Sequence, residues 1–307
     1  MLNVFIDGKN GTTGLKIEQR LSARKDIKLI SLPEEIRKDI SARKQALNSA
    51  DIAILCLPDD AAREAVSLIE NEKVCVIDAS TAHRTAAGWA YGFPELSYEF
   101  ENKIKNGKRI AVPGCHASGF IALIYPLVKA GLIDKDAALT CTSLTGYSGG
   151  GKKMIAEYET EKSALYKAPR VYGITQAHKH LPEMTAITGL NCAPVFIPTV
   201  CDFYSGMEVI VPIFKSQLLR GDIESVKAIY KELYNGNIVK YTEENENGFL
   251  SAAVLSEKDG MEISVFGNED RILLTARYDN LGKGASGAAI ECLNIVSGNK
   301  KEESLTL

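Results

Sequence analysis

One cysteine, in the stretch "VPGCHASGFIALIYPLV", lies where a strand-like run gives way to a helix-like run. This residue is Cys115. Pro113 and Gly114 end the strand, and residues 117–130 are typical of a helix that Gly131 ends. Unpaired N–H groups and the helix dipole at a helix N-terminus favour an anion. Lowering the ordinary thiol pKa of about 8.5 by ~2 units makes the thiolate the majority species at neutral pH. We therefore expect Cys115 to be a nucleophile.

The other six cysteines stand in apolar surroundings, where an inert buried thiol is the ordinary interpretation, and the same alternative applies to Cys115. They are Cys56, Cys75, Cys141, Cys192, Cys201 and Cys292. A disulfide framework is disfavoured because seven is an odd number, no C-x-x-C occurs, and the start "MLNVFIDGK" does not resemble a signal peptide. We therefore expect reduced thiols and a cytoplasmic protein.

A second polar cluster, in "AHKHLPEM", contains His178, His180 and Glu183. Two imidazoles and a carboxylate could bind zinc, but the H-E-x-x-H spacing is missing and Pro182 interrupts any helix that would align them, so we predict no metal site. Two interpretations are left. The histidines are a structural pair, or one of them is the acid and base beside a cysteine nucleophile, with the carboxylate orienting it.

Length and composition limit the class of protein. A chain of 307 residues suits two domains, and 45% hydrophobic residues, 24% charged residues and a net charge of -3 describe a globular protein with no basic stripe for nucleic acid. No apolar run reaches the ~18 residues that a membrane span requires. We expect neither a nucleic-acid partner nor a membrane partner.

The first hundred residues alternate strand-like and helix-like segments. Residues 2–7 ("LNVFID") are typical of a buried strand, a G-x-x-G-x-x-G turn follows, and residues 15–23 continue as an amphipathic helix. This context favours a loop that holds the pyrophosphate of a dinucleotide at the helix N-terminus, although a flexible surface turn is the alternative. The expected contacts are Gly8, Gly11, Thr12, Thr13 and Gly14.

Further strands at 27–32, 51–58 and 74–80, with helices at 39–50 and 59–70 between them, predict right-handed βαβ units and a doubly wound parallel sheet of the Rossmann type. The second strand ends at Ser31 and lacks there the acidic residue that holds the ribose of NAD.

Basic residues follow this strand at Arg37, Lys38 and Arg43, and together with Ser31 they favour the 2′-phosphate of NADP. Glu34 and Glu35 lie only a few residues after Ser31 and could hold the ribose of NAD, so NAD stays an alternative cofactor.

Six motifs in order give the chain a family resemblance. They are "FIDGKNGTTG", "DASTAHR" followed by "YGFPEL", "VPGCHASG", "SGGGKK", "AHKHLPEM" and "NLGKGASG". From residue 2 to about residue 295 the chain resembles the shorter form of the N-acetyl-gamma-glutamyl-phosphate reductases, and more distantly the aspartate-semialdehyde dehydrogenases. The resemblance implies NADPH-dependent reduction of an acyl phosphate to an aldehyde, in arginine biosynthesis.

The resemblance also implies roles for the residues of the motifs. Cys115 would attack the acyl phosphate to form a thioester, and His180 would be the acid and base, with His178 and Glu183 supporting it. Sequence does not decide which of the two histidines faces the sulfur.

Three more residues receive roles from the same resemblance. Ser80 and Asn280 would lie beside the nicotinamide, and Arg84 would anchor the phosphate or a carboxylate of the substrate. Two other functions stay open: reduction of a different acyl phosphate, either aspartyl or N-acylated aminoadipyl, and redox sensing by a non-catalytic NADP-binding protein.

The order of the motifs predicts a domain that is not contiguous in sequence. Residues 1–114 and 285–307 would form the NADP-binding Rossmann domain, and residues 115–284 an inserted α+β domain for catalysis and oligomerisation. Strand-like runs at 137–146, 192–200, 207–214, 261–267 and 271–279 would build a mixed or antiparallel sheet. We expect its outer face to be the subunit interface of a dimer or tetramer.

Overall fold

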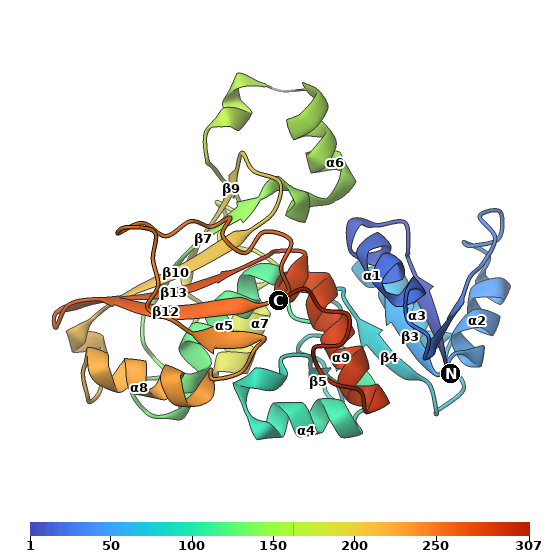
Figure 1. Ribbon diagram of the computed structural model, residues 1–307, viewed down its shortest axis with the longest axis horizontal. Helices are drawn as coiled ribbons and strands as arrows, with labels where there is room; N and C mark the ends of the chain where they lie inside the picture. Colours follow the sequence, from blue (N-terminus) through green and yellow to red (C-terminus); the bar gives the residue numbers. More distant parts are fainter. Residues whose placement is uncertain (162) are drawn as a thin grey trace. The chain divides into compact units, whose positions relative to one another are not determined.

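The computed structural model describes residues 1–161 and 163–307, and the chain divides into two compact units. The first unit comprises Met1–Pro94, Tyr98–Gly114 and Ala285–Leu305, and the second comprises Glu95–Ser97, Cys115–Gly284 and Thr306–Leu307. Each unit contains one sheet and the helices that pack on it (Figure 1).

The sheet of the first unit is parallel throughout, with the strand order β2-β1-β3-β4-β6-β5. Its strands are β1 (Leu2–Asp7), β2 (Ile27–Ile30), β3 (Ile52–Leu55), β4 (Cys75–Asp78), β5 (Ala90–Tyr91) and β6 (Arg109–Ala111). The strand order reverses direction between β1 and β3, which is the topology of a doubly wound sheet. The predicted fold class is therefore confirmed for this unit.

Helices cover both faces of this sheet because its strands are apolar on both sides. The helices of the unit are α1 (Thr12–Ser22), α2 (Ile40–Ser49), α3 (Asp59–Ser67), α4 (Tyr98–Asn106) and α9 (Gly287–Ser297). Buried residues of α1, α4 and α9 form one core with β1, β3 and β4, and buried residues of α2 and α3 form another on the opposite face. Neither α4 nor β5 was predicted from the sequence.

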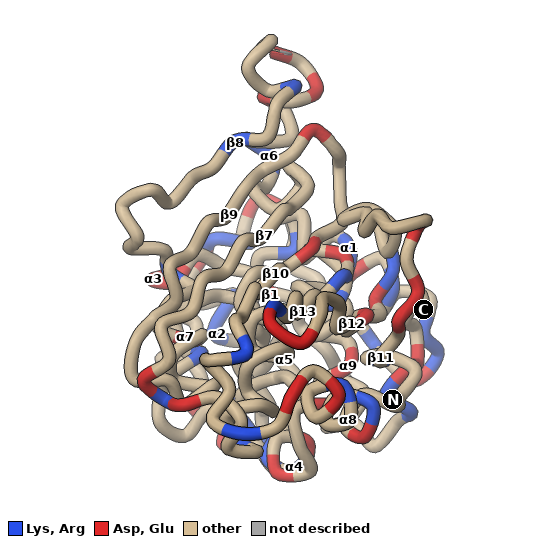
Figure 2. The backbone as a smooth tube through the Cα atoms, turned by 90° about the vertical axis from the view of Figure 1, so that its left-hand side faces the viewer, with Lys and Arg blue, Asp and Glu red and all other residues tan. Residues whose placement is uncertain are grey.

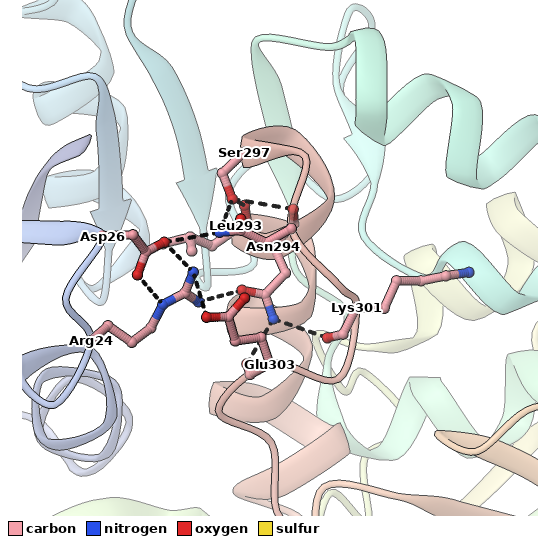
Figure 3. Close-up of polar contacts among 8 residues, drawn as sticks. Arg24, Asp26, Leu293, Asn294, Ser297, Lys301 and Glu303 are labelled. Carbon is pink, nitrogen blue, oxygen red and sulfur yellow. Dashed lines mark hydrogen bonds and ion pairs between the residues drawn. The ribbon is translucent and has the colours of Figure 1, made fainter. Parts of the chain in front are cut away.

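The helix α9 returns from the end of the chain to the core built by the first hundred residues, and a buried polar network fixes it there (Figure 3). Arg24 donates two hydrogen bonds to Asp26, at 3.0 and 2.6 Å, and a third to the Oδ1 atom of Asn294. The Nδ2 atom of Asn294 donates to the carbonyl oxygens of Lys301 and Glu303, at 2.9 and 2.8 Å. The Asn294 amide therefore joins α9, the C-terminal segment and the end of α1.

The sheet of the second unit is mixed, with the order β11-β12-β13-β10-β7-β9-β8. Its strands are β7 (Thr140–Gly146), β8 (Arg170–Val171), β9 (Val195–Cys201), β10 (Met207–Phe214), β11 (Val239–Tyr241), β12 (Met261–Gly267) and β13 (Arg271–Tyr278). The pairs β7/β9 and β11/β12 are parallel and the other pairs are antiparallel. This arrangement confirms the predicted mixed sheet.

One layer of helices packs on this sheet: α5 (Cys115–Lys129) lies against β10 and β13, with α7 (Leu181–Thr188) and α8 (Ile223–Leu233) beside it (Figure 1). A further helix, α6 (Gly151–Ala156), follows β7. Short 3-10 and π segments lie at η1 (Pro94–Leu96), η2 (Tyr147–Gly150), η3 (Glu157–Glu161), η4 (Ala164–Lys167), η5 (Lys215–Gln217) and η6 (Gly282–Ser286).

The other face of the second sheet, which we call the outer face, points away from α5. Val209 contacts α5, so the alternation of β10 turns Ile210, Pro212 and Phe214 to the outer face. Phe214 is 61% exposed, and a cavity of about 550 Å³ beside it is lined by Pro212, Leu273 and other residues of this face. The outer face therefore carries exposed apolar side chains next to a hollow.

Basic and acidic residues are interspersed along the backbone of both units (Figure 2). None of the helices within residues 1–161 and 163–307 combines the length and the hydropathy of a membrane-spanning segment.

Replacing Asn294 by alanine should lower the free energy of unfolding by about 2–4 kcal/mol, because Arg24 and two carbonyl groups lose their buried partner. Ser297→Ala is the matched control on α9: Ser297 is partly exposed and its hydroxyl bonds only to groups near it in sequence, so the loss should stay below about 1 kcal/mol. Urea unfolding followed by circular dichroism measures both. Equal losses would contradict the role given to Asn294.

Candidate active site

Cys115 is the first residue of α5, so the helix begins two residues earlier than predicted and the thiol lies in its first turn. Its side chain is partly exposed. Other thiols differ: burial raises the pKa of Cys56 to about 12 and that of Cys75 to about 11, which keeps both protonated and inert. Position at the start of a helix therefore distinguishes Cys115 from Cys56 and Cys75, and exposure distinguishes it from the buried Cys75.

The segment that follows β13 packs against Cys115. The hydroxyl of Tyr278 donates to the carbonyl oxygen of Cys115 and accepts a hydrogen bond of 3.0 Å from the Gly119 amide. A Cβ added at Gly284 would lie 3.0 Å from the Cβ of Cys115, so a larger residue would fit only if the two segments moved apart by a few tenths of an ångström. Both contacts come from residues that are remote from Cys115 in sequence, and neither was predicted.

A cluster of rings adjoins the start of α5. The ring of His116 lies 5.7 Å, between centroids, from those of both His178 and His180, which are 4.7 Å apart. Tyr172 and Phe196 complete the cluster, at 5.9 and 5.4 Å from His116. The residue next to the thiol in sequence therefore packs on both predicted histidines.

His116 is the structural histidine of this cluster. Its Nδ1 atom lies 2.6 Å from the Ser143 hydroxyl and its Nε2 atom 2.5 Å from the Tyr172 hydroxyl. Burial, with a smaller effect of His178, lowers the pKa of His116 to about 3, so the ring is neutral at physiological pH. One nitrogen then donates and the other accepts, and the ring serves to orient its neighbours.

The two predicted histidines immediately precede α7. The backbone N–H of His180 donates to the Nδ1 atom of His178 at 3.2 Å, and His180 is the N-cap residue of the helix. Pro182 lies in the first turn of α7, where proline is tolerated, so the helix carries Glu183 but neither histidine. Glu183 is 2% exposed.

The phenol groups near the thiol stay protonated. Burial raises the pKa of Tyr172 and of Tyr278 well above the ordinary value, and the charge of a thiolate at Cys115 raises both further. Both hydroxyls therefore act as neutral hydrogen-bonding groups.

Asn280 follows β13 and is 1% exposed. Its Oδ1 atom accepts from the Gly206 amide and its Nδ2 atom donates to the Ser148 hydroxyl, both at 3.0 Å. The carboxylate of Asp279 accepts from the amides of Leu281 and Gly282 at 2.7 Å. Asn280 thus ties this turn to Gly206 and Ser148, and Asp279 holds the backbone of the turn itself.

In the first unit, the glycine turn joins β1 to α1. Gly8 has a φ of +86°, and a Cβ there would lie 2.3 Å from the carbonyl oxygen of Cys56. A Cβ at Gly14 would lie 2.7 Å from the Gly8 carbonyl oxygen. Gly11 is the N-cap of α1, and Thr12 and Thr13 begin the helix. Strand, tight turn and helix N-terminus therefore provide the backbone that a pyrophosphate requires.

A cavity of about 230 Å³ lies at the carboxyl ends of β1 and β2, beside this turn. Its lining includes Asp7, Gly8, Ser31, Arg37, Lys38 and Arg43. Leu57 and Ala61, which follow β3, also line it, so the cavity extends toward the point where the strand order reverses, the usual ligand position in such sheets. Its lining contains basic residues that could hold an anionic group.

Arg43 is bound inside the protein. Its guanidinium donates twice to Asp7, at 3.1 and 3.0 Å, and once to Glu64 at 2.7 Å. Burial raises the pKa of Asp7, and the bond to Arg43 opposes that rise. We therefore revise the sequence-based interpretation of Arg43: although it lines the cavity, its guanidinium is already paired with the carboxylates of Asp7 and Glu64.

Ser80 and Arg84 lie after β4. The Ser80 hydroxyl donates to the carboxylate of Asp78 at 2.7 Å and accepts from the Ala82 amide at 3.1 Å. Arg84 donates to the carbonyl oxygens of Val112 and Ala79, at 2.9 and 3.3 Å. Because parallel strands end at one edge, Ser80 and the glycine turn lie on the same edge of the sheet.

Two protein-family models of the semialdehyde dehydrogenases match the chain. A "Semialdehyde dehydrogenase, NAD binding domain" matches residues 10–105, and a "Semialdehyde dehydrogenase, dimerisation domain" matches residues 115–280. Among solved structures, aspartate semialdehyde dehydrogenase from Francisella tularensis has a TM-score of 0.74 at 18% identity, covering 97% of this chain and 100% of that chain. The enzyme from Candida albicans, solved with NADP, has a TM-score of 0.69 at 15% identity and covers 97% and 98%. The chain thus has the semialdehyde dehydrogenase fold.

Curated relatives narrow this class. An N-acetyl-gamma-glutamyl-phosphate reductase from Chelativorans sp. is 46% identical over 304 residues, covering 95% of this chain and 97% of its own. Reductases of the same name from Sinorhizobium medicae and Pseudomonas putida are 45% and 43% identical, covering 95% and 96% of this chain and 98% and 96% of their own. The chain belongs to the N-acetyl-gamma-glutamyl-phosphate reductase family, which confirms the resemblance seen in its motifs.

Proposed function

We propose that this protein reduces N-acetyl-gamma-glutamyl phosphate to N-acetylglutamate semialdehyde, with NADPH as reductant and release of phosphate, in arginine biosynthesis. The observation that carries the proposal is the position of Cys115, in the first turn of a helix and next in sequence to a histidine that packs on His178 and His180. Membership of the family gives the substrate.

We keep the predicted division of the chain. Residues 1–114 with 285–307 bind NADP, and residues 115–284 carry catalysis and oligomerisation. The pyrophosphate binds at the turn of Gly8, Gly11, Thr12, Thr13 and Gly14, where a backbone free of side chains and the start of α1 provide N–H groups. Ser80 and Asn280 lie beside the nicotinamide of the bound cofactor.

The 2′-phosphate binds to Lys38. Arg43 is bound to Asp7 and Glu64, and Arg37 forms an ion pair of 2.5 Å with Glu34. Within the part of the chain that the structure describes, the ammonium of Lys38 forms no hydrogen bond or ion pair, although Lys38 lines the cavity beside Ser31. A cation without a carboxylate partner in that cavity suits a phosphate.

Cys115 is the nucleophile. Its thiolate attacks the γ-acyl carbon, a C–S bond forms, and the bond from that carbon to the phosphate oxygen breaks with release of inorganic phosphate. The N–H groups of the first turn of α5 stabilise the thiolate and the developing oxyanion. The chemistry that the nicotinamide supplies when bound is a hydride, the reductant for this thioester. Collapse of the hemithioacetal on Cys115 then breaks the C–S bond and frees the aldehyde.

His180 is the acid and base. It takes the proton of the Cys115 thiol and later moves a proton at the oxygen that becomes the aldehyde. The Nδ1 atom of His178 already accepts the His180 amide, which favours a supporting role for His178. Glu183, in the first turn of α7, orients the pair. Arg84, held by two carbonyl oxygens, anchors the phosphate or a carboxylate of the substrate.

The protein is a homo-oligomer, a dimer or a tetramer, formed through the outer face of the second sheet. Exposed Phe214 and the adjoining hollow of about 550 Å³ support this interface, and residues 115–280 match a dimerisation domain. The covalent mechanism requires a reduced thiol, so we assign the protein to the cytoplasm.

Cys115→Ser should lower turnover by about three orders of magnitude or more, because a serine alkoxide is far less accessible at neutral pH, while the affinity for NADPH stays unchanged. Phosphate-dependent reduction of NADP with N-acetylglutamate semialdehyde measures the reaction in reverse, and aspartate semialdehyde is tested beside it. Cys192→Ser, at an exposed thiol, is the control and should keep full activity. Activity of the Cys115 variant within tenfold of the wild type excludes the covalent mechanism, and faster turnover of aspartate semialdehyde excludes the substrate.

Lys38→Ala should weaken NADPH binding roughly tenfold and leave NADH binding unchanged, because only NADPH carries the 2′-phosphate. Isothermal titration with each nucleotide measures this without turnover. Lys44→Ala is the control, since Lys44 pairs with Glu70 on the surface and should affect neither nucleotide. Equal affinity of the wild type for the two nucleotides would rule out the assignment.

Phe214→Glu should reduce the molar mass in solution from that of the oligomer toward that of one chain, because a charge enters the apolar interface. Ile174→Glu, also at an exposed apolar residue of the second unit but outside its sheet, should keep the wild-type mass. Light scattering coupled to size-exclusion chromatography measures both. A single-chain mass for the wild type would contradict the proposed oligomer.

A further inference from the structure

Three buried tyrosines bind carbonyl groups of α5 from other elements of the second unit. The hydroxyls of Tyr230 and Tyr234, on and just after α8, donate to the carbonyl oxygens of Leu123 and Ala122 in the middle of the helix. The hydroxyl of Tyr278, at the end of β13, donates to the carbonyl oxygen of Cys115 in the first turn. All three side chains are fully buried.

The contact of Tyr278 differs from the other two because the same hydroxyl also accepts from the Gly119 amide at 3.0 Å. Residues 115 and 119 are the acceptor and donor of one helical i to i+4 step. The phenol oxygen therefore bridges the two groups of that step, and it ties the first turn of α5 to the sheet.

A glycine at position 119 leaves space for this bridge. A Cβ added at Gly119 would lie 2.8 Å from the Tyr278 hydroxyl and 2.6 Å from a methyl carbon of Val209, so an alanine there would push the helix away from the sheet. The chain that follows Tyr278 contacts Cys115 a second time, where Gly284 packs on its Cβ.

The position of that segment is itself fixed. Lys283, 2% exposed on its side chain, binds both carboxylate oxygens of Glu95 at 2.7 and 2.8 Å. Asp279 accepts from two amides of the turn and from the Glu257 amide. The Cys115 carbonyl and Cβ are therefore both held by a rigid segment that contacts the reactive residue but carries no group that reacts.

We propose that Tyr278 is a positioning residue for the Cys115 nucleophile: its hydroxyl fixes the carbonyl of Cys115 and the amide of Gly119, and so sets the orientation and the reactivity of the thiol. Only the expected effect of Tyr278 on turnover rests on the proposed function. The hydroxyl places a donor on the carbonyl nearest the sulfur, which reduces the negative potential that a thiolate meets there. Loss of the hydroxyl should make the thiolate harder to form.

The test compares Tyr278→Phe with Tyr234→Phe, which removes an equally buried hydroxyl from a carbonyl of the same helix seven residues further on. Alkylation by iodoacetamide is followed from pH 5 to 9 on the peptide that contains Cys115, since the chain has seven cysteines. We expect the midpoint of the Tyr278→Phe profile to rise by roughly half a pH unit and that of Tyr234→Phe to stay at the wild-type value. Both variants should lose similar thermal stability.

A second variant separates positioning from a merely structural effect. Incorporation of 3-fluorotyrosine at position 278 makes the phenol a stronger hydrogen-bond donor without changing the packing appreciably. The alkylation midpoint should then move down, opposite to the change in Tyr278→Phe. A structural defect would lower reactivity in both variants, and that outcome, or a Tyr278→Phe profile equal to that of Tyr234→Phe, overturns the proposal.

Turnover completes the test. In Tyr278→Phe, kcat should fall about threefold with KM within twofold of the wild type, because half a pH unit changes the thiolate fraction by about that factor and the bond does not act on substrate binding. The alkylation profile needs no substrate, so the two proposals can fail separately. If Cys115→Ser retains activity, the proposed function fails while the profile still reports on Tyr278. If Cys115→Ser is inactive and the Tyr278→Phe profile is unchanged, the positioning role alone fails.

Discussion

The burial of α5 is the constraint on which the second unit depends. The helix is enclosed along most of its length, from His116 to Leu127, so its neighbours must supply close packing and partners for its polar groups. Tyrosine hydroxyls meet its carbonyls, and Gly119 lets the sheet approach. The first turn carries the buried polar residues His116 and Ser118, and Cys115 there is partly exposed. An enclosed helix thus begins at one partly exposed thiol.

The first unit depends on a different device, a set of carboxylates at the ends of its strands. Asp7 ends β1 and Asp78 ends β4, and both are buried. Each carboxylate has a partner later in the chain. Arg43 of α2 binds Asp7, and Ser80, which follows β4, binds Asp78. These bonds hold the loops at the ligand-binding edge in place, which spares a bound nucleotide the cost of ordering them.

Local patterns predicted the features that depend on neighbouring residues. The strand–glycine–helix run at Gly8 and the Pro-Gly turn before Cys115 fold as their sequences indicate, because turns and helix starts are decided within a few residues. Long-range partners could not be predicted. From their local sequence, His116 is an ordinary helical residue, Tyr278 a strand residue and Arg43 a surface cation. Their contacts with remote residues form only in the folded chain. A signal was present for His116, a histidine directly after the cysteine.

The return of α9 to the first core has a consequence for how the chain folds during synthesis. Ala288, Ile290 and Leu293 belong to the core that β1 and α1 begin, yet residues 115–284 are translated between them. The ribosome therefore releases nearly the whole second unit before the first can close. The unit that starts the chain is finished last, and until then the face that α9 covers is an exposed apolar surface. We therefore expect the first hundred residues of the nascent chain to need chaperone protection until α9 has been synthesised.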